Sequence, residues 1–123
     1  MEYKRLHEGS YRFLSLIWEN EPIGSMQLVK LCENEFGWKK STTFTMLKKL
    51  EEKGLVKNEG SVVKSLVTRD NVQRTESRLF VDQTFSGSLP DFLTAFFVGK
   101  PISDEEAREL NERIEALRKG GEQ

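Results

Sequence analysis

The chain has 123 residues, 37% of them hydrophobic and 32% charged, and its formal net charge at pH 7 is −1. This size fits one domain, or a small domain with an appendage, and the near-neutral charge argues against indiscriminate nucleic-acid binding. The single cysteine, Cys32, excludes an intramolecular disulfide and a cysteine-based metal cluster. No apolar run is long enough to span a membrane and the first residues lack a signal-peptide core, so we expect a cytoplasmic protein without membrane insertion.

Two helices are predicted first. One runs from about residue 10 to residue 18 and has an apolar face at helical spacing, formed by Tyr11, Leu14, Ile17 and Trp18. The next runs to about residue 36, with Gly24 or Ser25 as its N-cap and Ile23 as a hydrophobic staple. Gly37 closes this second helix, and Trp38 anchors the turn that follows.

A third predicted helix, from about residue 41 to Lys53, has two different faces. Its inward stripe consists of Thr43, Met46, Leu47 and Leu50. Its outward face holds hydroxyls and lysines, and Gly54 ends it. Residues 55–58 and 61–64 then flank Glu59-Gly60 and predict a β-hairpin. The order predicts a mainly α winged helix-turn-helix with a small hairpin wing, over residues 1–67.

The charge pattern makes the third helix a candidate DNA-binding element. Six lysines between Phe36 and Lys57 stand against two glutamates, a local balance of +4. Threonine hydroxyls suit base edges, a phenylalanine can touch a thymine methyl or pack on the sugar backbone, and lysines suit phosphates. For each lysine alone, a solvated charge remains the alternative. The predicted contacts are Lys39, Lys40, Ser41, Thr42, Phe44, Thr45, Lys48 and Lys49 from the helix, with Lys57 and Lys64 from the wing.

Residues 68–123 are predicted to form a helical dimerisation domain. Helices are expected from about residue 70 to 85, from Pro90 to about residue 98, and after a Ser103–Glu106 capping box. These segments bring more aromatic area than a short appendage can hide, so a second copy of the chain is the favoured cover. The alternative is that the helices fold back on the winged helix. The predicted interface is formed by Leu79, Phe80, Phe92, Leu93, Phe96, Phe97, Leu110, Ile114 and Leu117.

Several segments together resemble the penicillinase repressor family, which includes the methicillin-resistance regulators and the copper-responsive repressors. They are Leu16-Ile17-Trp18-Glu19 with Ile23, the run from Trp38 to Val56, Leu66-Val67-Thr68-Arg69-Asp70, Glu76-Ser77, Phe80-Val81-Asp82 and Phe85-Ser86-Gly87-Ser88. The resemblance covers nearly the whole chain. It implies a dimeric repressor that binds a palindromic operator through its winged helix, and whose C-terminal helices interlock with those of its partner.

In the β-lactam-responsive branch, the resemblance further implies a membrane-embedded sensor metalloprotease that triggers cleavage of the repressor. The implied cleavage site is the bond between Ala95 and Phe96. Ala95 stands where the well-known cleaved members carry asparagine. The chain lacks the C-terminal paired cysteines of the copper branch, so copper sensing is not expected, and its second wing strand is shorter than is usual in the family.

Other classes of function remain open. A winged helix used only for protein contact would show no salt-sensitive DNA affinity. A small-ligand sensor would use the aromatic cluster of residues 92–97 as its pocket. An enzyme is not expected, because the chain has no Cys/His/Asn set, no Gly-rich phosphate loop and no metal-binding histidine pair. No cofactor and no metal site are predicted.

Overall fold

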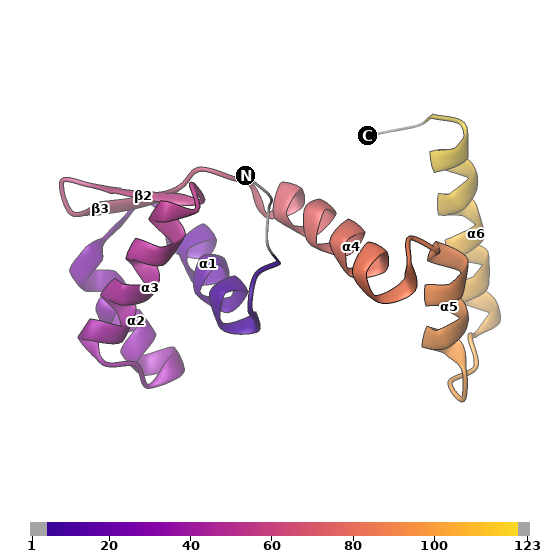
Figure 1. Ribbon diagram of the computed structural model, residues 1–123, viewed down its shortest axis with the longest axis horizontal. Helices are drawn as coiled ribbons and strands as arrows, with labels where there is room; N and C mark the ends of the chain where they lie inside the picture. Colours follow the sequence, from indigo (N-terminus) through magenta and orange to yellow (C-terminus); the bar gives the residue numbers. More distant parts are fainter. Residues whose placement is uncertain (1–4, 121–123) are drawn as a thin grey trace. The chain divides into compact units, whose positions relative to one another are not determined.

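The structure is a computed structural model that describes residues 5–120 (Figure 1). The described elements are, in chain order, α1 (Glu8–Asn20), β1 (Ile23–Gly24), α2 (Ser25–Phe36), α3 (Lys40–Glu52), β2 (Val56–Glu59), β3 (Val62–Ser65), α4 (Arg69–Phe85), α5 (Leu89–Phe97) and α6 (Asp104–Arg118). The chain divides into two compact units, Met1–Phe80 and Val81–Gln123. We call them the winged-helix unit and the helical unit. The sequence placed this boundary earlier, between residues 67 and 68.

The winged-helix unit contains a three-stranded antiparallel sheet in the order β1-β3-β2. The hairpin of β2 and β3 was predicted, each strand one residue earlier than it lies. The first strand was not predicted: Ile23 pairs with Val63, and Gly24 with Val62. Ile23 was expected only to staple the start of α2; it is instead a buried strand residue. β1 therefore ties the start of the helix-turn-helix to the wing.

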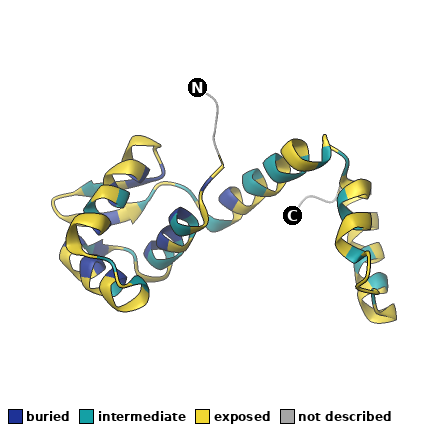
Figure 2. Cartoon of the chain, turned by 60° about the horizontal axis from the view of Figure 1, so that its bottom comes forward, coloured by how far each residue is buried: buried dark blue, intermediate teal, exposed yellow. Residues whose placement is uncertain are grey.

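The core of this unit follows from the helical spacing of its apolar side chains. In α1, Phe13, Leu14 and Ile17 are fully buried, which is the inward face that periodicity predicted for the first helix. The remaining buried core is formed by Leu6, Ile23, Leu28, Cys32, Leu47, Leu50, Leu55, Val56, Val63 and Val72. Figure 2 shows these buried residues in the three helices, the sheet and the start of α4. The mainly helical winged-helix fold is confirmed.

The helical unit is built differently. Ser88 caps α5 by accepting a hydrogen bond from the Asp91 N–H at 3.1 Å, and Ser103 caps α6 in the same way from Glu106 at 3.1 Å. Both caps lie where the sequence predicted a helix start. Among residues 81–120, however, no side chain is buried (Figure 2). This unit has helices with well-formed ends but no core of its own.

Candidate DNA interface

A short turn between α2 and α3 fixes where the candidate recognition helix begins. Gly37 ends α2 in the left-handed region, with φ of 70°, and donates its N–H to the Glu33 carbonyl at 2.9 Å. The Trp38 ring then packs against Phe36 and Phe13, with ring centroids 4.7 and 5.6 Å apart. Since Trp38 is held on the core, α3 starts directly after it, with Lys39 as its N-cap residue.

The inward face of α3 holds the helix on the core. Thr43, Leu47 and Leu50 are buried, as the predicted stripe requires, while Met46 is half-buried and packs against the core. Thr43 lies beside Cys32 of α2. Burial raises the pKa of the Cys32 thiol, and the Thr43 hydroxyl offsets this effect in part. The thiol therefore stays neutral near pH 7, which suits a core residue and not a nucleophile.

The outward face of α3 is polar, cationic and exposed. Seven of the predicted DNA-contacting side chains on this element are exposed: Lys39, Lys40, Ser41, Thr42, Thr45, Lys48 and Lys49. Within residues 5–120, none of these four lysines has an ion pair. Phe44 is placed differently, because it is half-buried and packs against the core. The structure thus brings together hydroxyls and ammonium groups without ion pairs on one exposed face, which is the chemistry that phosphate and base-edge contacts use.

The wing presents two further lysines on one face. Lys57 of β2 and Lys64 of β3 are directly opposite each other in the register, and both are exposed. Like charges in directly opposite positions are destabilising in a sheet. Lys57 is also paired with Glu59, with 3.3 Å between its Nζ and the carboxylate. The wing lysines are therefore only partly compensated by the protein itself.

Two carboxylates that the sequence analysis overlooked position this wing. Glu21 accepts hydrogen bonds from the Ser65 N–H at 2.7 Å and from the Ser65 hydroxyl at 3.0 Å. Glu51, near the end of α3, accepts the Asn58 N–H of β2 at 3.2 Å. The Glu21–Ser65 contact has no local sequence signal, because the two residues are 44 positions apart. Glu51 and Asn58 are only seven positions apart, but one lies in a helix and the other in a strand, so no single periodic pattern joins them. Together they fasten the wing to the connection after α1 and to α3.

In the helical unit, the predicted interface residues form an aromatic and aliphatic surface. Consecutive rings contact one another, with centroid distances of 5.5 Å for Phe85–Phe92, 6.0 Å for Phe92–Phe96 and 5.1 Å for Phe96–Phe97. Phe96, Ile114 and Leu117 are 52%, 42% and 67% exposed. The other predicted interface residues are half-buried: Leu79, Phe80, Phe92, Leu93, Phe97 and Leu110. Leu79 and Phe80 belong to the winged-helix unit.

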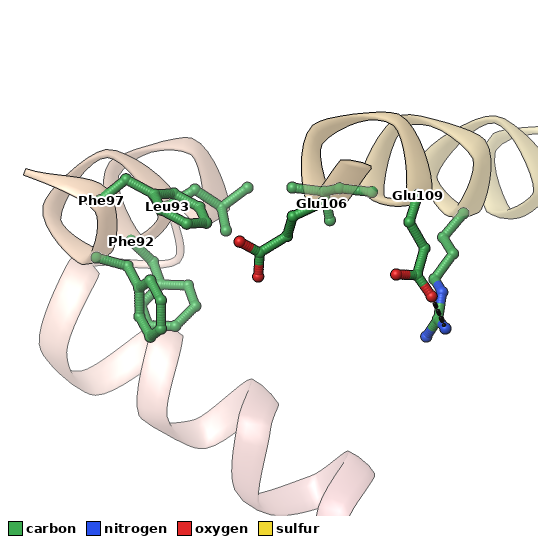
Figure 3. A pocket seen from close by; sticks show the side chains of 8 residues that line it. Phe92, Leu93, Phe97, Glu106 and Glu109 are labelled. Atoms are coloured by element: carbon green, nitrogen blue, oxygen red, sulfur yellow. Dashed lines mark hydrogen bonds and ion pairs between the residues drawn. The ribbon is translucent and has the colours of Figure 1, made fainter. Parts of the chain in front are cut away.

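Between α5 and α6 the same surface is hollowed into a cleft of about 300 Å³ (Figure 3). Its lining consists of Phe92, Leu93, Phe96 and Phe97 from α5, with Glu106, Glu109, Leu110 and Arg113 from α6. The Glu106 carboxylate projects toward α5, whereas Glu109 is paired with Arg113 at 2.7 Å (Figure 3). The apolar surface of this unit is therefore concave, with acidic groups at one edge.

The comparisons with known proteins agree with this arrangement. A family described as penicillinase repressor matches residues 10–116, which is most of the chain. The chain belongs to the penicillinase repressor family. This membership makes it a transcription regulator and not an enzyme, as the sequence predicted.

The comparisons with individual proteins give weaker similarities than the family match. No curated protein matches the chain. Among solved structures, a MarR protein from Peptoclostridium difficile DA00132 is similar, at 21% sequence identity, with 94% of this chain and 70% of that chain covered and a TM-score of 0.42.

The described part of this penicillinase repressor family member has neither a membrane-spanning helix nor a cluster of metal-binding side chains. No helix of the described chain is long and apolar enough to cross a membrane. Between residues 5 and 120, no three His, Cys, Asp or Glu side chains come together as a possible metal site. The outward face of α3 is thus the arrangement of described residues with the clearest functional chemistry.

Proposed function

We propose that two copies of this chain bind one palindromic DNA operator, each through the outward face of α3, and thereby repress transcription. The observation that carries the proposal is the exposed face of α3, where hydroxyls lie among lysines that have no ion pair within the described chain. Membership of a repressor family supports the same reading.

The residue roles follow from side-chain chemistry. Thr42 and Thr45 lie three residues apart on the exposed face of α3, where their hydroxyls and methyl groups can read base edges in the major groove. The phosphate contacts come from Lys39, Lys40, Lys48 and Lys49, with Lys57 and Lys64 on the flanking backbone. Phe44 is half-buried, so its contribution is to hold α3 on the core with its exposed edge near the sugar backbone.

The helical unit supplies the two-fold contact in this proposal. Its apolar side chains are half-buried or exposed, and a second copy would bury them. A closed two-fold dimer also matches a palindromic site, since each half-site then meets one α3.

Release of the operator is proposed to follow from damage to this same unit. The Ala95–Phe96 bond lies inside α5, and both residues are exposed. Cutting it would separate α6 and the last aromatic residues of α5 from the rest of the chain. A sensor metalloprotease is the partner proposed to trigger the cut.

The test is fluorescence-anisotropy binding to the duplex from the protein's own upstream region, across a salt series. Wild type is compared with the double variant Thr42→Ala/Thr45→Ala, and with Thr94→Ala on α5 as a matched control. We expect salt-dependent binding with two chains per duplex, lost in the double variant and kept in the control. Absence of binding at low salt on any duplex would overturn the proposal and favour a protein-contact module or an obligatory small ligand.

A further inference from the structure

One face of α4 is fastened to the winged-helix unit turn by turn. At its start, the Arg69 guanidinium lies 5.0 Å from the Trp18 ring centroid and 3.8 Å from the Glu19 carboxylate. One turn later, Val72 is buried in the core and Gln73 donates a hydrogen bond to the Tyr11 hydroxyl at 3.2 Å. These positions recur at helical spacing, so the first turns of α4 are docked on α1.

Beyond Gln73 the contacts come from residues that precede α1. The Glu76 carboxylate accepts the Leu6 N–H at 3.0 Å and pairs with Arg5, whose Nε lies 3.2 Å away. The Arg5 guanidinium also lies over the Phe80 ring, 5.2 Å from its centroid. Leu6 itself is buried in the core, at 8% exposure. Arg5 and Leu6 are therefore part of the unit, and they contact α4 at Glu76 and Phe80.

Glu76 makes the polar contacts that join α4 to Arg5 and Leu6. Its side chain is only 17% exposed, and its carboxylate binds both the backbone N–H of Leu6 and the guanidinium of Arg5. Phe80, whose ring lies under the Arg5 guanidinium, is also the last residue of the winged-helix unit. Arg5 thus contacts α4 at the last residue of that unit.

We propose that Glu76 is a positioning residue for operator binding: by holding Arg5 and Leu6, it keeps α4 fixed on the winged helix up to Phe80. The inference rests on the proposed dimeric function, because its consequence concerns two half-sites. When one α3 helix is bound, a fixed separation of the two α3 helices raises the effective concentration of the second helix at its half-site. If α4 can move relative to the winged helix, that effective concentration falls. Binding to a single half-site does not depend on the separation of the two α3 helices.

The decisive experiment compares each variant on two duplexes, one carrying the full palindrome and one carrying a single half-site. The variants are Glu76→Gln and Arg5→Gln. The matched control is Asp82→Asn, which removes one negative charge from an exposed position of the same helix. We expect Glu76→Gln to weaken full-palindrome binding about tenfold with little change on the half-site. Arg5→Gln has a smaller effect in the same direction, and Asp82→Asn has none.

Three outcomes separate the possibilities. Equal losses on both duplexes mean that Glu76 only stabilises the winged helix, and they overturn the inference. Unchanged binding to both duplexes overturns it as well. If wild type gains nothing from the second half-site, the dimeric operator proposal fails instead.

Hydrogen exchange of the free protein tests, without DNA, whether Glu76 holds α4 on the winged helix. In Glu76→Gln, the amides of residues 77–80 should exchange roughly tenfold faster than in wild type, while those of α3 keep their protection. Unchanged exchange at residues 77–80, or equally faster exchange in α3, contradicts the positioning role.

Discussion

The two units of the molecule reach order by different routes. In the part of the chain that the structure describes, every buried hydrophobic side chain lies between Leu6 and Val72, within the winged-helix unit. The helical unit has none, although α5 is the most apolar helix of the chain. The charges differ too: the first unit has 14 lysines and arginines against 11 aspartates and glutamates, and the second has 5 against 9.

This difference shows what each unit needs from outside itself. The winged-helix unit buries most of its apolar residues and leaves the lysines of the α3 face without an ion pair among the described residues, which suits the anionic partner proposed for it. The helical unit leaves its apolar residues exposed or half-buried, which suits the apolar partner surface proposed for it. Mutations should therefore act on the folding of the first unit and on the association of the second.

The largest expected effect is on folding of the winged-helix unit. Phe13→Ala removes a fully buried ring that packs on Trp38, and it should lower the free energy of unfolding by about 3–5 kcal/mol. Urea unfolding followed by the fluorescence of Trp18 and Trp38 measures the loss, because both tryptophans lie in this unit. A loss below about 1 kcal/mol would contradict the core described for this unit.

The next effect sharpens the contrast with the helical unit. Phe96→Ala removes a 52% exposed ring, so the tryptophan-detected unfolding of the first unit should hardly change, while self-association weakens about tenfold. Sedimentation equilibrium measures the association constant. Thr94→Ala is the control on the same helix, since the Thr94 side chain is exposed and its hydroxyl donates to the Pro90 carbonyl of its own helix at 2.9 Å. An unaltered association constant in Phe96→Ala would remove this residue from the interface.

A smaller effect is expected at the cationic face. Lys48→Ala removes an exposed ammonium group without an ion pair among residues 5–120, so DNA affinity should fall a few-fold for every sequence. The slope of log affinity against log salt should become shallower by about 1. Lys119→Ala, in the helical unit, should keep the wild-type slope. A slope unchanged in both variants would show that Lys48 does not neutralise a phosphate.

The smallest effect is a pH dependence from the core. Because burial raises the pKa of the Cys32 thiol, the folded chain keeps this proton at a pH where the unfolded chain releases it. The contribution to stability is complete below the ordinary thiol pKa and is lost as pH rises toward the raised one. As pH rises above the ordinary thiol pKa of about 8.5, wild type should therefore lose more stability than Cys32→Ala. Parallel urea curves for the two proteins would contradict this.

Local patterns predicted much of the first unit and little of its long-range contacts. The buried stripe of Thr43, Leu47 and Leu50 recurs within one helix, so its periodicity was visible in the sequence. The pairing of Ile23 with Val63 was not, because a two-residue strand has no pattern of its own and its partner is 40 positions away. For the same reason, nothing in the sequence pointed to the contacts of Arg5 and Leu6 with Glu76.

In the two proposed interfaces, too, the features that recur along one helix could be predicted and the contacts to other parts could not. The outward face of α3 could be predicted, since residues that avoid the buried stripe must face away from it. The pattern did not show that Phe44, a predicted DNA contact, is half-buried against the core. The apolar stripes of α5 and α6 could be predicted too. A single chain cannot say what covers them, because that depends on a surface that belongs to another molecule.

The short strand β1 has a practical consequence for protein engineering. It pairs with β3 at Ile23 and Val63, and the Ser25 N–H donates to the Ser61 carbonyl at 2.9 Å, so the chain from Ser25 to Ser61 leaves and returns at neighbouring positions of one sheet. Antiparallel neighbours lie only about 5 Å apart. This segment holds α2, α3 and β2, and with them part of the buried core. If α3 binds the operator as proposed, we expect that exchanging residues 25–61 between relatives transfers the operator preference, provided that their core contacts to α1 and β3 match.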